Sequence, residues 1–123
     1  MTKSDREKAA NAVAVSRIVV GSSAWLTPNL AGRMFGLDPD NNPQLPYVGR
    51  LFGARDVALG AGLLRASRKR KQPWMAAAVA CDVADTAAGV LAGARGQLPP
   101  GAAALVTATA GAFAAAGIWL LHQ

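Results

Sequence analysis

The sequence predicts an all-α, polytopic membrane protein, a bundle of four transmembrane helices with both ends of the chain in the cytoplasm. Three observations lead to this prediction. Four apolar segments each have about 18–22 residues, which is the length that an α-helix needs to cross about 30 Å of hydrocarbon. The last segment contains no charged residue. Lys and Arg residues gather in the connections on one side of the predicted spans, as expected at a cytoplasmic membrane surface.

The four predicted spans form a single membrane domain that takes in the whole chain, residues 1–123. Proline residues mark several of their limits, because proline ends or begins a helical pattern. Pro28 follows the first span, Pro73 begins the third, and the pair Pro99–Pro100 precedes the fourth. Trp or Tyr residues lie near an end of each span, where aromatic rings meet lipid headgroups. The predicted spans are approximately residues 9–26, 47–66, 73–94 and 101–121.

A soluble helical bundle is the main alternative, because most of the apolar residues have small side chains. Hydrophobic residues make up 52% of the chain, but aromatic residues make up only 6%. A soluble helix needs a polar stripe at helical spacing to face water. The segment 101–121 offers only Thr107 and Thr109 as polar side chains. This segment therefore favours a membrane over water.

The connection between the first two spans has two parts. Residues 29–37 place Leu30, Met34 and Phe35 around the polar Arg33, and this pattern predicts a short helix at the membrane surface. Residues 38–46 are rich in Asp, Asn and Pro, and we expect a turn-rich connector there.

The positions of the basic residues set the predicted orientation. The chain has a net charge of +6, and a basic run without an acidic residue follows the second span. Positive residues mark the cytoplasmic side, so the ends of the chain and this run are predicted to lie there. Nucleic-acid binding would need basic residues interleaved with aromatic ones on a folded face, so we expect a lipid surface as partner and no nucleic acid. The basic run consists of Arg65, Arg68, Lys69, Arg70 and Lys71.

Six ionisable residues lie inside the predicted spans, three basic and three acidic. They are Arg17, Arg50, Arg55, Asp56, Asp82 and Asp85. A lone charge near the middle of a membrane costs at least about 2.5–3.5 kcal/mol, so these groups are expected to pair. The helix rise of 1.5 Å per residue places all of them except Arg50 at similar depths. Two interpretations remain open: an ion network that fixes the helix register, or a polar site for a proton, an ion or a lipid headgroup.

The chain offers little for catalysis or for metal and cofactor binding. Its one cysteine, Cys81, lies in an Ala-rich run, where a small packing role is usual. The one histidine is His122, and no nucleophile–base motif is present. We therefore expect no enzyme activity, no catalytic residue, no metal and no cofactor.

Small residues recur at four-residue spacing in three predicted spans. The pairs are Gly49 with Gly53, Gly89 with Gly93, and Gly111 with Ala115. This spacing allows helix backbones to approach closely, within the chain, in a second copy or in another protein. The fourth span has no charge, so we expect it to pack by small residues alone and to be the first to face a partner or lipid.

Three stretches of the sequence resemble one family. They are RMFGL at 33–37, YVGRLFGARDVALG at 47–60 and DVAD at 82–85. Together they resemble the small four-helix membrane proteins grouped as the DUF4267 family, and the most specific part is Arg-x-x-Gly-x-Arg-Asp-x-x-Leu-Gly. The resemblance implies a four-span membrane fold and no defined activity, and Arg17 has no counterpart in it.

Two functions fit these features. The first is a small accessory subunit of a larger membrane assembly, with an envelope lipid-transport complex as one candidate. The second is a self-contained, homo-oligomeric carrier or channel that uses the intramembrane Arg/Asp residues. Both predict a multi-pass protein of the cell (inner) membrane, whose partners are membrane lipids and either other membrane-protein subunits or further copies of the chain.

Overall fold

The computed structural model describes residues 1–123 and is entirely helical. Four long helices and one short helix account for most of the chain, and a single 3-10 turn lies in the connection between the short helix and the second long one. The elements are α1 (Lys3–Leu26), α2 (Pro28–Met34), η1 (Pro39–Asn41), α3 (Leu45–Arg65), α4 (Arg68–Ala94) and α5 (Pro100–Leu121).

The first helix begins six residues earlier than the apolar pattern predicts, because a capping box forms at its start. The Thr2 hydroxyl accepts a hydrogen bond from the Asp5 N–H at 3.1 Å, and the Thr2 N–H donates to the Asp5 carboxylate at 3.0 Å. This hydrogen bond from the Thr2 backbone holds the pKa of Asp5 below its ordinary value. The capping box thus extends α1 into a polar, exposed segment.

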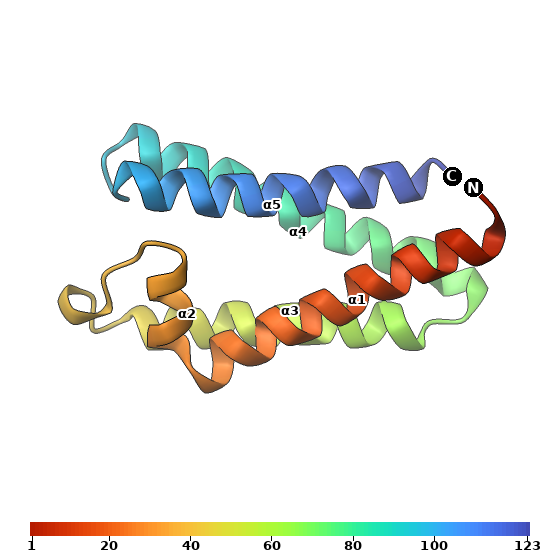
Figure 1. Cartoon of the computed structure of the whole chain (residues 1–123), viewed down its shortest axis with the longest axis horizontal. Helices are drawn as coiled ribbons and strands as arrows, with labels where there is room; N and C mark the ends of the chain where they lie inside the picture. The colour runs from red at the N-terminus through yellow and green to blue at the C-terminus, as the bar shows by residue number, and fades with distance from the viewer.

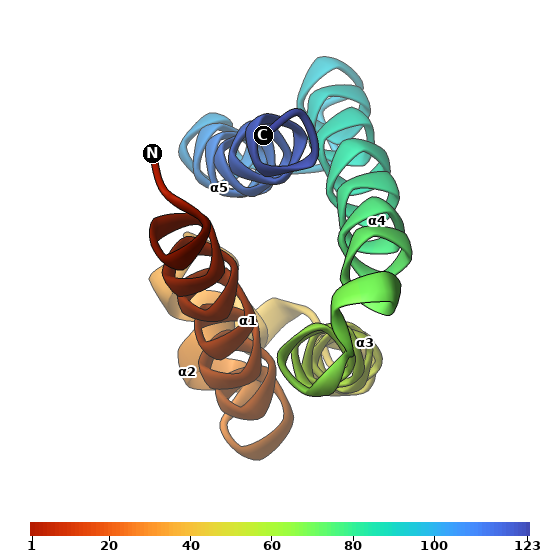
Figure 2. The same cartoon turned by 90° about the vertical axis from the view of Figure 1, so that its right-hand side faces the viewer.

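The four long helices pack as two pairs. In Figures 1 and 2, α1 lies beside α3 and α4 lies beside α5, and contacts between the two pairs are much sparser. Seen end-on, the helices follow one another in the order α1, α3, α4, α5 around the molecule (Figure 2). The chain ends and the turn between α3 and α4 lie at the same end of the molecule (Figure 1).

Backbone contact at glycines brings α1 and α3 together. A Cβ atom added at Gly53 would lie 2.4 Å from the carbonyl oxygen of Gly21, and one added at Gly60 would lie 2.6 Å from that of Ala14. No real Cβ atom tolerates such distances, so this crossing requires glycine. The expectation that small residues mediate helix contacts is confirmed for this pair.

The α4–α5 pair also depends on glycines, but here the atoms nearest to the added Cβ belong to side chains of the facing helix. A Cβ atom at Gly89 would lie 2.4 Å from the Thr107 hydroxyl oxygen, and one at Gly117 would lie 2.5 Å from a methyl carbon of Val79. Gly111 is less crowded, because the nearest atom to its added Cβ lies 3.9 Å away. Close approach between α4 and α5 therefore does involve small residues, at Gly89 and Gly117.

The prediction of four transmembrane helices in one bundle is wrong. The structure has five α-helices, and three of them, α1, α4 and α5, are long and apolar enough to cross a membrane. Helix α3 does not qualify, because every span-length stretch of it contains Arg50, Arg55 and Asp56. Ion pairing lowers the free-energy cost of placing such charges in a membrane, but the helix remains polar in composition. The predicted placement of both chain ends in the cytoplasm depended on an even number of spans and does not follow from three.

The short helix expected within residues 29–37 is present as α2, and a connector containing η1 follows it. Pro28 occupies the first turn of α2, where its missing N–H costs no hydrogen bond. The chain leaves the helix at Gly36, whose φ of +80° favours glycine.

Large apolar side chains lie mostly on the outside of the molecule. Only 18 of 123 residues are buried, and Leu63 is the only large side chain that is fully enclosed. Val15 and Val83 are 48% and 50% exposed in the middle of their helices. A soluble protein of this size buries its large apolar residues, whereas a membrane protein exposes them to lipid. This distribution agrees with the three helices that can cross a membrane.

Candidate functional site

The centre of the molecule holds an arginine that contacts two carboxylates on two other helices. Only 3% of the Arg17 side chain, on α1, is exposed. Its Nη1 lies 3.2 Å from Oδ1 of Asp56 on α3, and its Nη2 pairs with Oδ2 of Asp82 on α4. The two carboxylate side chains are only 8% and 6% exposed. One guanidinium group therefore links three helices.

A second ion pair lies beside the first and is more accessible. Arg55 Nη1 on α3 donates to Asp85 Oδ1 on α4 at 3.1 Å, and Arg55 Nη2 pairs with the other oxygen, Oδ2. Such a two-pronged arrangement matches the planar guanidinium to the carboxylate. The two side chains are 36% and 30% exposed. This pair gives a second link between α3 and α4.

Helix geometry explains how the five residues meet. Asp82 and Asp85 are three residues apart on α4 and so share a face. Arg55 and Asp56 are neighbours on α3 and point about 100° apart. Asp56 can therefore reach towards α1 while Arg55 reaches towards α4. We call Arg17, Arg55, Asp56, Asp82 and Asp85 the Arg/Asp cluster.

Two aromatic rings that the sequence analysis missed complete the surroundings. The Arg17 guanidinium carbon lies 5.1 Å from the ring centre of Phe113 on α5, and that of Arg55 lies 5.2 Å from the ring of Phe52. These distances fit cation–π contacts. Helix α5 therefore touches the Arg/Asp cluster through an aromatic ring, and the prediction that it packs by small residues alone was incomplete. The available signal was a lone Phe in the middle of an Ala-rich segment.

The formal charges of the cluster do not cancel. Two guanidinium groups face three carboxylates, which leaves one negative charge in excess. The Nε atoms of Arg17 and Arg55 are buried and have no hydrogen-bond partner. The cluster therefore carries an excess of negative charge and two buried donors without an acceptor.

Arg50 does not join the cluster. Its Nε donates to the main-chain oxygen of Trp25 at 3.1 Å, near the C-terminal end of α1. The residue is exposed, and its contact satisfies a carbonyl that the helix end leaves free.

The predicted basic loop is largely helical. Only Ala66 and Ser67 separate α3 from α4, so four of the five basic residues form the first turn of α4. Lys71 reaches back to α1, where its Nζ lies 3.3 Å from Asn11 Oδ1 and 4.0 Å from Glu7 Oε1. The others, Arg65, Arg68, Lys69 and Arg70, have no acidic partner within 4.0 Å.

The fold and the cluster define a class of protein. The chain is an all-α protein in which three helices are long and apolar enough to cross a membrane and buried ion pairs link the helices. No group of three His, Cys, Asp or Glu residues is arranged to hold a metal ion. Comparisons with protein-family models, with curated proteins and with solved structures found no match. The resemblance to the DUF4267 family therefore stays a prediction.

Proposed function

We propose that the chain is an accessory subunit of a larger membrane assembly and that it docks on its partner through α4. One observation carries this proposal. Alanines follow one another at four-residue spacing along the face of α4 that no other helix covers, and each of them is exposed. These residues are Ala76, Ala80, Ala84 and Ala88. We call them the α4 alanine strip.

The opposite face of α4 is used within the chain. Met75, Ala78, Asp82 and Gly89 are its buried residues. Elsewhere in the molecule, small residues mark the places where helix backbones touch, as at Gly53 against Gly21. A strip of alanines offers little surface to lipid but lets another helix approach closely. The α4 alanine strip therefore fits a helix of a partner protein.

In this proposal the Arg/Asp cluster has a structural role. It fixes how the α1–α3 pair sits against α4–α5, so that the alanine strip has one defined shape. A subunit of this kind has no chemistry of its own, and an envelope lipid-transport complex is one assembly that could contain it.

Purification in a mild detergent, followed by mass spectrometry, tests the proposal. A photo-crosslinking residue at position 87, which is exposed beside the strip, should yield a covalent product with another membrane protein, and adding Ala84→Leu to that chain should abolish the product. Ala112→Leu adds the same bulk at an exposed position on α5 and is the matched control. Recovery of the chain alone, with no crosslinked product, would refute the proposal.

The homo-oligomeric carrier or channel is a second candidate, and one observation favours it. The Arg/Asp cluster has an unbalanced carboxylate, and the Arg55–Asp85 pair is about one-third exposed. A cation or proton could use such a group. Purified protein in liposomes should then conduct protons or ions, and Asp85→Asn and Arg55→Gln should each reduce the flux, whereas Arg50→Gln should not. Unchanged flux in both cluster variants would exclude this function.

A further inference from the structure

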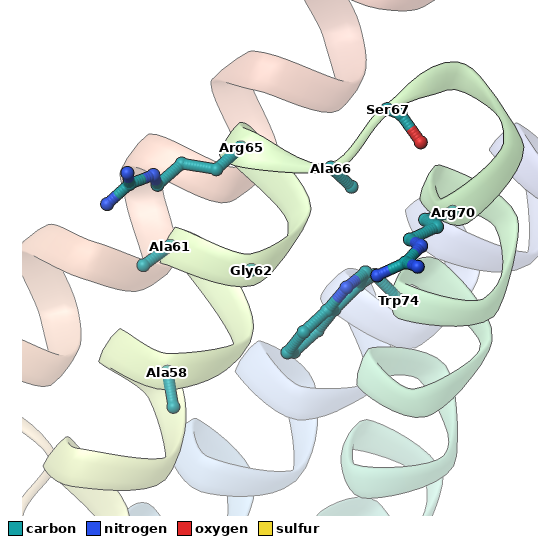
Figure 3. Close-up of a pocket in the computed structure, with 8 residues that line it drawn as sticks. All are labelled: Ala58, Ala61, Gly62, Arg65, Ala66, Ser67, Arg70 and Trp74. Atoms are coloured by element: carbon teal, nitrogen blue, oxygen red, sulfur yellow. The ribbon is translucent and has the colours of Figure 1, made fainter.

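A groove opens between the last turns of α3 and the first turns of α4. Figure 3 shows the residues that line the groove, and its volume is about 640 Å³. The two helices are joined by a short turn at Ala66 and Ser67 and make few contacts beyond it, which leaves a wedge between them. The groove lies apart from the Arg/Asp cluster, since no cluster residue lines it.

The inner wall of the groove is apolar. Ala58, Ala61 and Gly62 supply it from α3, and Trp74 closes it from α4. A Cβ atom at Gly62 would lie 2.3 Å from the indole ring of Trp74, so the ring rests directly on the α3 backbone. Trp74 is 36% exposed, and its amphipathic ring suits the boundary between hydrocarbon and headgroups.

The mouth of the groove is cationic. The Arg70 side chain extends alongside Trp74, whereas that of Arg65 extends away on the other side of α3 (Figure 3). Neither arginine has an acidic partner within 4.0 Å, and no acidic residue lines the groove.

The start of α4 adds hydrogen-bond donors to the same mouth. Ser67 lies at the N-cap position of α4 but makes no side-chain capping bond, so its hydroxyl is free to bind a ligand. The first N–H groups of a helix also lack acceptors within that helix. A free guanidinium, a free hydroxyl and these N–H groups together suit the oxygens of a phosphate.

We propose that this groove binds one anionic phospholipid. Its phosphate lies against Ser67 and Arg70, and one acyl chain runs along Trp74 towards Ala58. Helix α4 is apolar enough to cross a membrane, so its basic first turn is at a membrane surface, where such headgroups are found. Ala58 is eight residues before Ala66, or about 12 Å along α3, so the apolar wall extends from the mouth towards the hydrocarbon. The site does not depend on the proposed partner protein.

Native mass spectrometry of the full chain released from nanodiscs tests this inference. The probes are phosphatidylglycerol and phosphatidylcholine, at equal mole fraction. We expect one phosphatidylglycerol retained per chain, and a roughly tenfold loss of its affinity in Arg70→Gln, as for removal of a charge-assisted hydrogen bond. Lys69→Gln is the matched control, because it removes the same charge from the same turn but does not line the groove.

A second pair of variants tests the apolar wall. Ala58→Leu should fill the groove and weaken retention of phosphatidylglycerol, whereas Ala54→Leu, exposed on the same helix outside the groove, should not. Equal losses in Arg70→Gln and Lys69→Gln would mean general attraction to an anionic surface and would overturn the site. Displacement of the lipid by millimolar inorganic phosphate would also overturn it, because a site for phosphate alone needs no acyl chain.

Discussion

Replacing Arg17 by methionine tests whether the Arg/Asp cluster holds the two helix pairs together. The change removes the charge while keeping a long side chain. It leaves Asp56 and Asp82, whose side chains are 8% and 6% exposed, as buried carboxylates without their counter-ion. Breaking a buried ion pair from one side costs about 3–5 kcal/mol. We expect Arg17→Met to lower the free energy of unfolding by about that amount.

Replacing one of the carboxylates instead of Arg17 should lower the free energy of unfolding by a smaller amount. Asp82→Asn leaves Arg17 with Asp56 at 3.2 Å, and the asparagine oxygen can still accept a hydrogen bond. The loss should resemble that of one hydrogen bond to a charged group, about 1.5–3 kcal/mol. Adding Arg17→Gln to Asp82→Asn should then cost less than the sum of the two single changes, since these residues interact directly.

Unfolding by sodium dodecyl sulfate in detergent micelles, followed by tryptophan fluorescence, measures these energies. The control is Arg33→Met, because Arg33 pairs with Asp40 at 3.1 Å but the two side chains are 53% and 79% exposed. Exposed pairs contribute about 0–1 kcal/mol. If Arg17→Met destabilises the protein no more than Arg33→Met, the cluster does not hold the helices together.

Three further predictions follow from single contacts. Gly53→Ala should destabilise the α1–α3 crossing by about 1–3 kcal/mol in the same unfolding assay, because its new Cβ would lie 2.4 Å from the Gly21 oxygen. Gly101→Ala, with no atom within 4 Å of the added Cβ, should instead be neutral or stabilising. Phe113→Leu should cost about 0.5–2 kcal/mol in that assay, through loss of the contact with Arg17, and an unchanged midpoint would contradict the cation–π assignment. Thr2→Pro, which removes the backbone N–H that donates to Asp5, should raise the pKa of Asp5 towards its ordinary value, as measured by NMR titration. In the native chain the pKa of Asp5 is lowered, so its stabilising effect on α1 is present above the unfolded-state pKa and is lost as pH falls through the folded-state value.

Hydropathy and proline positions were enough to locate the long helices, but α1 and α4 begin six and five residues earlier than predicted. The predicted span 73–94 is extended in the structure to Arg68–Ala94, with Pro73 inside the helix. The basic residues looked like a loop because they are polar and because positive charge is unfavourable in the first turn of a helix, yet α4 begins with them directly after Ser67. The apolar pattern indicates only the part of a helix that is buried or meets lipid. It therefore does not predict how far the helix continues beyond that part.

The residues of the cluster could be predicted, but their partners could not. Depth along each helix follows from the rise per residue, so Arg17 and Asp82 were expected at one level. The rotation of each helix about its axis decides which carboxylate meets which guanidinium, and that rotation depends on contacts such as Gly53 on Gly21. The same reason explains why Phe113 was missed, since a lone Phe among alanines marks the residue but does not show that its ring faces Arg17.

Each helix pair is held together by its own contacts, so the role of the Arg/Asp cluster is to position one pair against the other. The α1–α3 pair is held by close backbone approach at glycines, and the α4–α5 pair by glycines that make room for side chains of the facing helix; none of these contacts needs a charged partner. Between the pairs, Arg17 and Arg55 make the polar links at the centre of the molecule, and each needs its carboxylates at fixed positions. A shift of one pair along the other by one helical turn would leave buried charges without partners, at a cost of several kcal/mol each. The glycines therefore bring helices together within each pair, and the charges select one register between the pairs.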